Sequence, residues 1–361
     1  MERFLHGGNI YKEASPLGEW LDFSANINPL GLPDSARRAI IEHIDDIEHY
    51  PEPDAPKLKN ALGKHYDLPV EQIVLGNGAS ELFYLFFYTV RPKKVLIPVP
   101  SFGEYERAAI ASGAEPVFLQ LRQDMDFSID LEELKSQLPG ADCLILGNPN
   151  NPTGNLISLK QMKKIAALCN DLRCWLLVDE SFLDFRQDCE GLTVRHMVQE
   201  YERLFVIQSM TKFYSIPGLR LGFGVAPPGL RESMEKGKDV WNVNLLAQEA
   251  GLAALADDDY AMRSRDLLEK EQAFLMDELR RFKAIHPLIP TVNFMLLKCE
   301  TSSLANSILN GMKSRGILLR GCDNYRVLES GEYLRMAIRS RRENLKLLNA
   351  LSEILQEENS I

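Results

Sequence analysis

Four short apolar runs, each ending in a cluster of small or polar residues, constrain the fold of this chain more than any other feature of its sequence. The runs cover residues 73–75, 143–146, 175–178 and 204–207. Short apolar runs that end in turn residues and alternate with helix-like segments indicate buried strands of a parallel sheet. In open α/β sheets a ligand binds beyond the carboxyl ends of the strands, so we expect the four polar clusters to meet in one crevice.

The cluster after the run at 204–207 contains a lysine among hydroxyl groups. Ser209, Thr211 and Lys212 stand there, and Arg220 follows the lysine eight residues later. A lysine just beyond a buried strand could hold a carbonyl cofactor as a Schiff base, and nearby hydroxyls and an arginine suit that cofactor's phosphate. A lysine in a loop is more often a solvated surface charge, so the assignment depends on the other clusters.

The clusters after two further runs supply polar partners for the ring of such a cofactor. Asp179 follows the run at 175–178 and can pair with a protonated pyridine nitrogen, which keeps the ring cationic and electron-withdrawing. Asn151 follows the run at 143–146 and can hydrogen-bond a ring oxygen. Together with Lys212, these residues indicate a site for pyridoxal 5′-phosphate.

The turn after the first run completes the site at its anionic end. Gly78, Ala79 and Ser80 precede an apolar segment of helical length, so their backbone N–H groups and the helix dipole could bind the cofactor's phosphate. Most glycine-rich turns only reverse the chain, and the order of the motifs is what favours phosphate binding here. Phe102, after another apolar run, could stack on the cofactor ring or be an ordinary core aromatic.

Three of these motifs resemble those of the fold-type I aminotransferase family, class I/II, and the resemblance covers essentially the whole chain. They are the Asn-Pro-Thr-Gly motif at 151–154, the pair at 179–180, and the Ser-x-Thr-Lys motif with its downstream arginine. The resemblance implies an α/β fold, with a mostly parallel central sheet flanked by helices in a large domain and a smaller C-terminal α/β domain. We expect residues 1–30 to form an N-terminal arm, 31–230 the large domain that binds the cofactor, and 231–361 the small domain.

Two branches of the family fit the sequence. Residues 6–9 (His-Gly-Gly-Asn), residues 21–31, and the paired segments 319–322 and 333–340 resemble the threonine-phosphate decarboxylases of cobalamin biosynthesis. Histidinol-phosphate aminotransferases share much of the second half but usually lack the His-Gly-Gly-Asn start, and they commonly carry tyrosine where this chain has Phe182. The resemblance therefore implies decarboxylation of L-threonine O-3-phosphate, or L-serine O-phosphate, with histidinol-phosphate transamination as the alternative.

The resemblance also implies which residues bind the substrate, namely His6, Gly7, Asn26, Asn151, Arg320 and Arg335. Arg335 stands where the family binds the α-carboxylate, and because it alternates with apolar residues, an unpaired charge there would be costly without a ligand. His6, in an arm with little periodicity, could instead be merely exposed. Tyr50 resembles the residue that reaches across a homodimer to the neighbour's cofactor phosphate, so we expect a homodimer with shared sites.

Composition limits the other functions that this chain could have. The net charge of −10 and the pI near 5.3 argue against a broad nucleic-acid or anionic-membrane surface. The six cysteines form no CxxC pair and no metal-like cluster, and no signal segment or membrane-spanning run is evident, so we expect a cytoplasmic enzyme without bound metal. A non-enzymatic regulator that binds the cofactor would need an added DNA-binding domain, for which the acidic chain, with about 50 residues before the first βα unit, offers neither room nor charge.

Overall fold

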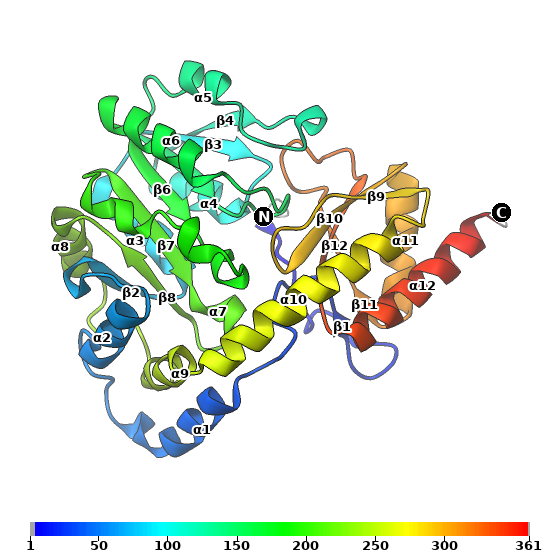
Figure 1. The fold of residues 1–361 in the computed structure, drawn as a ribbon, viewed down its shortest axis with the longest axis horizontal. Coiled ribbons are helices and arrows are strands. Elements are labelled where there is room, and N and C mark those ends of the chain that lie inside the picture. Colours follow the sequence, from blue (N-terminus) through cyan, green and yellow to red (C-terminus); the bar gives the residue numbers. More distant parts are fainter. Residues whose placement is uncertain (1–3, 360–361) are drawn as a thin grey trace.

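The computed structural model describes residues 4–359, and its larger sheet carries all four of the predicted strands (Figure 1). In spatial order the seven strands are β2 (Ile73–Asn77), β8 (Leu221–Val225), β7 (Leu204–Ser209), β6 (Trp175–Asp179), β5 (Cys143–Gly147), β3 (Lys94–Val99) and β4 (Glu115–Gln120). β8 runs antiparallel to both of its neighbours, whereas all the other adjacent pairs are parallel. The mostly parallel central sheet is thereby confirmed.

The strand register brings the ends of the predicted runs to one edge of this sheet. Gly147 at the end of β5 pairs with Asp179 at the end of β6, and Asp179 pairs with Ile207 near the end of β7. Ser209 pairs with Gly222 at the start of the antiparallel β8. The polar clusters that follow these strands therefore start side by side.

Helices cover both faces of the larger sheet because its strands are apolar on both sides. The helices of this part are α1 (Asp34–Glu42), α2 (Pro56–His65), α3 (Ala79–Val90), α4 (Gly103–Ala111), α5 (Leu131–Gln137), α6 (Leu159–Asp171), α7 (Met210–Phe213), α8 (Pro228–Gly237) and α9 (Leu245–Leu255). Cys143 and Ile145 pack on one face with α3 and α4, and Leu144 and Leu146 pack on the other face with α5 and α6. This alternation on a doubly buried sheet explains the unbroken apolar runs.

Short 3₁₀ helices complete the connections around this sheet. They are η2 (Ile44–Glu48), η3 (Val70–Gln72), η4 (Gln123–Met125), η5 (Leu183–Phe185), η6 (Cys189–Gly191) and η7 (Arg195–Gln199).

A second, smaller sheet is formed by the C-terminal part of the chain. Its antiparallel strands are β12 (Arg320–Gly321), β13 (Tyr333–Ala337), β10 (Phe294–Cys299) and β9 (Ile285–Pro287), with α11 (Ser302–Ser314) and α12 (Arg341–Asn359) beside them. The short β1 (Leu21–Asp22) pairs in parallel with β11 (Ile317–Leu318). The N-terminal segment is therefore tied to the C-terminal part of the chain.

The segment between the two sheets consists of three helices. α8 begins with Pro228 in its first turn, and α9 packs against α1 and α2. The long α10 (Asp258–Leu279) runs from the larger part of the molecule to the smaller one (Figure 1). The domain division that we place at residue 230 stays a prediction, although α9, which follows it, packs on the large sheet's helices. Within residues 4–359 no helix is long and apolar enough to span a bilayer.

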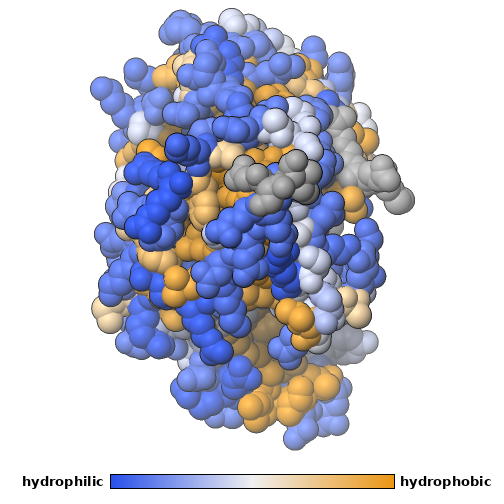
Figure 2. Space-filling model, turned by 90° about the vertical axis from the view of Figure 1, so that its right-hand side faces the viewer, coloured by the Kyte–Doolittle hydropathy of each residue, from blue (hydrophilic) through white to orange (hydrophobic). Residues whose placement is uncertain are grey.

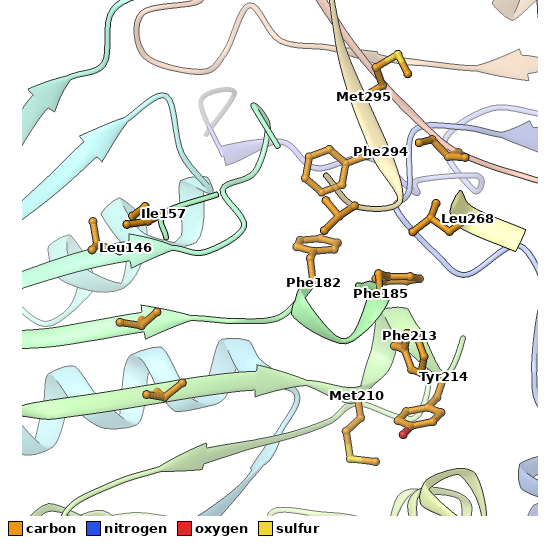
Figure 3. Close-up of a cluster of buried hydrophobic side chains, with 14 of the residues drawn as sticks. Leu146, Ile157, Phe182, Phe185, Met210, Phe213, Tyr214, Leu268, Phe294 and Met295 are labelled. Atoms are coloured by element: carbon orange, nitrogen blue, oxygen red, sulfur yellow. The ribbon is translucent and has the colours of Figure 1, made fainter. Parts of the chain in front are cut away.

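Apolar side chains join the two parts beside the carboxyl edge of the larger sheet. Phe182, in the loop after β6, and Phe294, on β10, face one another with ring centres 5.0 Å apart (Figure 3). Phe185 packs in the same way against Phe213, the last residue of α7. The first contact ties the loop after β6 to the C-terminal part of the chain, and the second ties η5 to α7 within the larger part.

Candidate active site

A cavity of about 550 Å³ lies at the carboxyl edge of the larger sheet. The predicted residues that line it are His6, Gly7, Asn26, Ala79, Ser80, Phe102, Asn151, Ser209, Thr211, Lys212, Arg220 and Arg335. They come from the N-terminal segment, from the loops after the parallel strands and from β13. Four other predicted residues, Tyr50, Gly78, Asp179 and Arg320, lie outside the lining, and their positions are described below.

Lys212 lies in α7, directly after the central strand β7. Ser209 caps α7, and its Oγ accepts a hydrogen bond from Lys212 Nζ at 3.2 Å. The phenyl ring of Phe182 stands 5.4 Å from the same nitrogen. Removal of the ammonium from bulk water lowers the pKa of Lys212 to about 8; the positive charge of Arg220 acts in the same direction, and Asp179 opposes it. About a tenth of the lysine is therefore a nucleophilic amine at pH 7, against less than about a thousandth at the ordinary pKa of a lysine.

Asp179 stands behind the cavity at the end of β6 and is 7% exposed. The backbone N–H of Ser181 donates to Oδ1 at 2.9 Å, and the hydroxyl of Tyr105 donates to Oδ2 at 2.7 Å. Burial, followed by the charge of Asp179, raises the pKa of Tyr105 well above its ordinary value, so the phenol stays protonated and donates. The two donors hold the carboxylate in one orientation.

The loop between β2 and α3 forms a cradle for an anion. Gly78 has a φ of +76°, and a Cβ on it would lie 2.3 Å from Nη2 of Arg220, so the glycine leaves room for the guanidinium. A Cβ on Gly222 would lie 2.7 Å from the backbone nitrogen of Ala79, so that strand β8 can pass close under the start of α3. The first N–H groups of a helix have no partner within it and carry its positive dipole end.

Two hydroxyls stand beside this cradle. The Oγ of Ser209 and the Oγ1 of Thr211 lie 2.8 Å apart, and both residues line the cavity with Ser80 and Arg220. Hydroxyls, helix N–H groups and an arginine are the donors that proteins use for phosphate.

Arg335 reaches the opposite wall of the cavity from β13 and is 5% exposed. Its Nη1 donates to Oδ1 of Asn151 at 2.6 Å, and its Nη2 donates to the carbonyl oxygen of Ser24 at 2.6 Å. Tyr325 Oη lies 3.4 Å from Nη1. These partners are neutral, so the guanidinium keeps its charge available for an anionic ligand. Because Oδ1 of Asn151 is taken, its amide nitrogen is the atom that can donate to a cofactor oxygen.

The N-terminal segment closes one side of the cavity. A Cβ on Gly7 would lie 2.1 Å from the carbonyl oxygen of Ser24, and the N–H of Gly8 donates to Ser24 Oγ at 2.8 Å. His6 Nε2 lies 2.8 Å from Glu104 Oε1. Asn26 is 6% exposed, and its Oδ1 is buried without a hydrogen-bond partner in the described structure. A ligand in the cavity that carries a donor would satisfy this oxygen.

Arg320 and Tyr50 make contacts elsewhere. Arg320 Nη2 donates to the carbonyl oxygen of Leu5 at 2.7 Å and to Oδ1 of Asn324 at 2.6 Å, so this arginine holds the N-terminal segment. Tyr50 is 77% exposed and stacks on Trp241 with ring centres 4.4 Å apart. The substrate role of Arg320 and the role of Tyr50 in a neighbouring site stay predictions.

The sequence did not reveal several residues of the site. Glu104 and Tyr105 lie in the first turn of α4, which begins directly after Phe102. Their closeness in sequence to this predicted ring-stacking residue is the only signal that could have indicated them. Tyr325 lies in an irregular loop between β12 and β13, where no periodicity marks it. Phe182, which the sequence does single out, lines the cavity as well, together with Asp22 and Ser24 of the segment 21–31.

The donor set of the site fits pyridoxal 5′-phosphate. It combines an amine of lowered pKa, a buried carboxylate, an amide donor and an anion cradle whose glycines could not carry a side chain. Among residues 4–359, no group of three His, Cys, Asp or Glu side chains is placed to hold a metal ion.

Comparison with known proteins gives one family for almost the whole chain. The family model for aminotransferases of class I and II matches residues 18–351. A threonine-phosphate decarboxylase from Salmonella typhimurium strain LT2 is 37% identical over 355 residues, which cover 97% of this chain and 96% of that protein. A histidinol-phosphate aminotransferase from Methanosarcina mazei is 32% identical, with 97% of this chain and 93% of that protein covered.

A solved structure is similar in fold as well as in sequence. The histidinol-phosphate aminotransferase from Clostridium acetobutylicum superposes with a TM-score of 0.86 at 32% identity, and the match covers 94% of this chain and all of that one. The fold-type I architecture expected from the sequence is thereby confirmed.

Proposed function

The chain belongs to the class I and II aminotransferase family, and within it we propose that the chain is a pyridoxal-phosphate-dependent decarboxylase of L-threonine O-3-phosphate. The product would be the corresponding amino alcohol phosphate, the linker of the nucleotide loop in cobalamin biosynthesis. The observation that carries the choice of reaction is the position of the His-Gly-Gly-Asn segment, whose His6 and Gly7 line the cavity. That segment is the part of the sequence that most resembles the decarboxylase branch.

The cofactor would be held by the residues that the motifs predict. Lys212 would bind its carbonyl carbon, Asp179 its pyridine nitrogen and Asn151 its ring oxygen, with Phe102 against the ring. Its phosphate would lie among Gly78, Ala79, Ser80, Ser209, Thr211 and Arg220. When bound, pyridoxal phosphate supplies an electron sink for the electron pair left on Cα when a bond to that carbon breaks.

The protein's own contribution to the reaction is orientation and proton delivery. Arg335 would bind a carboxylate or phosphate oxygen of the substrate, and His6 and Asn26 would bind its other polar groups. Which bond at Cα is presented to the electron sink depends on how these residues hold the substrate. For decarboxylation, the C–C bond breaks, CO₂ leaves without its electron pair, and Lys212 in its ammonium form donates the proton that replaces CO₂ at Cα.

Histidinol-phosphate transamination is the second candidate, favoured by the full-length likeness to the Clostridium acetobutylicum structure. In that reaction neutral Lys212 would remove the proton from Cα instead of delivering one. L-Serine O-phosphate is a further candidate substrate for decarboxylation, because one methyl group in a pocket changes binding by only about 1–3 kcal/mol.

A product assay on the loaded enzyme separates these candidates. The enzyme is offered O-phospho-L-threonine or O-phospho-L-serine in one set, and L-histidinol phosphate with 2-oxoglutarate in another. Release of CO₂ with the matching amino alcohol phosphate supports the proposal and ranks the two substrates. Formation of glutamate without CO₂ would make the protein an aminotransferase, and the N-terminal resemblance would have misled us.

A homodimer is the second part of the proposal. Ile41, Ile44 and Ile47 of α1 and η2 are 65%, 43% and 61% exposed, and the stacked rings of Tyr50 and Trp241 are exposed as well. Figure 2 shows an otherwise mostly hydrophilic face with apolar surface at its lower end, the end at which Figure 1 places α1. A second copy of the chain would cover such a surface and bring Tyr50 to the neighbour's cofactor phosphate.

The location in the cytoplasm stays a prediction. The cysteines at 143, 169, 174, 189, 299 and 322 are all free and buried, which suits a reducing compartment.

A further inference from the structure

His6, at the mouth of the cavity, makes a close pair with a buried carboxylate. Its Nε2 lies 2.8 Å from Glu104 Oε1, and the exposed fractions of the two side chains are 41% and 8%. Glu104 stands in the first turn of α4, two residues after Phe102. The ring centre of Phe102 is 5.4 Å from that of His6. The pair thus joins the N-terminal segment to the helix that begins at the cofactor-stacking residue.

Glu104 has two hydrogen-bond donors besides His6. Tyr84 donates its hydroxyl to Oε2 at 3.1 Å, and Arg107 donates from Nη1 to Oε1 at 3.2 Å. Burial alone would raise the pKa of Glu104, but the hydrogen bonds from His6, Arg107 and Tyr84 outweigh it and leave the pKa below its ordinary value. Glu104 is therefore a fixed carboxylate, and Arg107 offsets part of its negative charge.

The backbone around His6 is also fixed. The carbonyl of Leu5 accepts a hydrogen bond from Arg320 at 2.7 Å, and Gly7 lies so close to Ser24 that no side chain would fit on it. With both neighbours of His6 held, the ring has little freedom except rotation about its side-chain bonds. The contact from Nε2 to Glu104 removes that freedom and leaves Nδ1 as the nitrogen that can serve a ligand.

A carboxylate on one ring nitrogen decides what the other nitrogen can do. A histidine ring that donates to a carboxylate from Nε2 is an acceptor at Nδ1 when neutral and a donor at Nδ1 when protonated. Only the protonated form attracts an anion such as a phosphate monoester.

We propose that Glu104 is a positioning residue that fixes His6 as a donor to the phosphate group of the substrate. The inference rests on the proposed function for the phosphate ester, but it does not depend on whether the enzyme removes CO₂ or transfers the amino group. It assigns to α4 a part in substrate selection that none of the cofactor-binding motifs carries.

The first test is the Glu104→Gln variant, which keeps the shape of the side chain and removes its charge. We expect KM for O-phospho-L-threonine to rise about tenfold while kcat stays within about twofold, because one charge-assisted hydrogen bond to the substrate is weakened. Inhibition by L-threonine, which lacks the phosphate, should be unchanged. The matched control is Glu106→Gln, which removes a carboxylate from the same helix; Glu106 pairs with Arg326 at 2.6 Å. An equal rise of KM in the control would contradict the proposal.

A double-mutant cycle with His6→Ala separates positioning from a general effect on folding. If Glu104 acts through His6, adding Glu104→Gln to His6→Ala should change KM by less than about twofold. A further tenfold rise of KM when Glu104→Gln is added to His6→Ala would overturn the proposal.

A binding measurement keeps this inference apart from the proposed reaction. The Kd of inorganic phosphate for the loaded enzyme, measured by calorimetry, needs no turnover. It should rise about tenfold in Glu104→Gln and not in Glu106→Gln. If the wild-type enzyme released no CO₂ but phosphate binding behaved in this way, the proposed function would fail and the role of Glu104 would stand. An unchanged Kd of phosphate in Glu104→Gln would contradict the proposed role of Glu104, whichever reaction the enzyme catalyses.

Discussion

At the scale of single residues, the proposed role of Lys212 implies that its pKa sets the pH at which the cofactor is captured. Burial first and Arg220 second lower this pKa to about 8, against about 10.4 for a free lysine. Below about pH 8 the amine of the cofactor-free protein is an ammonium and cannot attack a carbonyl, and above it the amine is neutral. The rate of cofactor capture should therefore rise with pH through about 8 and then level off.

The rate is measured from the growth of visible absorbance after pyridoxal phosphate is added to cofactor-free protein at a series of pH values. A rate that continued to rise about tenfold per pH unit beyond pH 9 would mean that Lys212 keeps the ordinary pKa of a lysine.

Replacement of Lys212 tests its central role directly. Lys212→Ala should abolish the visible band of the bound cofactor and lower CO₂ release by at least about a thousandfold, since nucleophile and proton donor are lost together. Lys236→Ala is a matched control, because Lys236 is exposed and forms an ion pair with its helix neighbour Glu232 at 2.6 Å. Survival of the visible band in Lys212→Ala would refute the assignment of the site.

If Asp179 binds the cofactor as proposed, Tyr105 should affect cofactor binding through it. Tyr105→Phe leaves Oδ2 of the buried carboxylate without its 2.7 Å donor, and the loss of a hydrogen bond to a charged group costs about 1.5–3 kcal/mol. We expect the Kd of pyridoxal phosphate, measured by absorbance titration, to rise at least about tenfold. Tyr88→Phe, at a position 56% exposed, is the control and should leave the Kd unchanged.

At the scale of elements, the loop after β6, which follows Asp179, is held by the buried guanidinium of Arg195. Arg195, in η7, is fully buried, with Glu180 at 3.7 Å, Asp184 at 3.9 Å and the ring of Tyr66 4.2 Å below its guanidinium. Glu180 follows Asp179, and Asp184 lies in η5 after Phe182. Burial raises the pKa of Glu180 to about 7, and Arg195 opposes this rise.

Removal of this arginine should destabilise the protein in a pH-dependent way. Arg195→Met leaves buried carboxylates unpaired, which costs about 3–5 kcal/mol at pH 8. At pH 6 the cost should be smaller, because the raised pKa lets Glu180 take up a proton and lose its charge in the folded state. Melting temperatures at the two pH values check this.

Arg263→Met is the control for that experiment, because the side chain of Arg263 is 59% exposed and forms an ion pair with Asp259 at 2.8 Å on the surface. It should change the melting temperature little. If Arg195→Met lowered the melting temperature equally at both pH values, Glu180 would not be the group whose protonation reduces the cost.

What could be predicted from the sequence is the part of the site that strand ends determine. Lys212, Asp179 and Asn151 follow apolar runs, and the parallel register brings such positions together whatever the rest of the chain does. Glu104 and Tyr105 could not be found in this way, because their roles depend on how α4 is rotated over the sheet. The contact between Gly7 and Ser24 could not be foreseen either, since it joins irregular segments.

At the scale of the whole molecule, the N-terminal segment connects the two parts of the chain across the cavity. His6 binds Glu104 on the side of the larger sheet, whereas Leu5 binds Arg320 beside the smaller sheet. β1 adds a backbone pairing to β11 in the C-terminal part. Movement of one part against the other would therefore change the position of His6 at the cavity mouth.

The proposed homodimer makes a prediction that only the assembled molecule can test. If Tyr50 serves the neighbour's cofactor phosphate, the Tyr50→Ala and Lys212→Ala variants are defective in residues of different chains that build one site. A dimer with one chain of each kind then contains one intact site, formed by Lys212 of one chain and Tyr50 of the other, and one site that lacks both residues. After unfolding and refolding of an equal mixture, about half of the dimers should be mixed, so about a quarter of all sites should be intact.

CO₂ release should then exceed the mean of the two separately refolded variants and approach a quarter of the wild-type rate. Activity equal to that mean would place Tyr50 and Lys212 in the same chain's site, and light scattering that found a fully active monomer would rule out the shared site altogether.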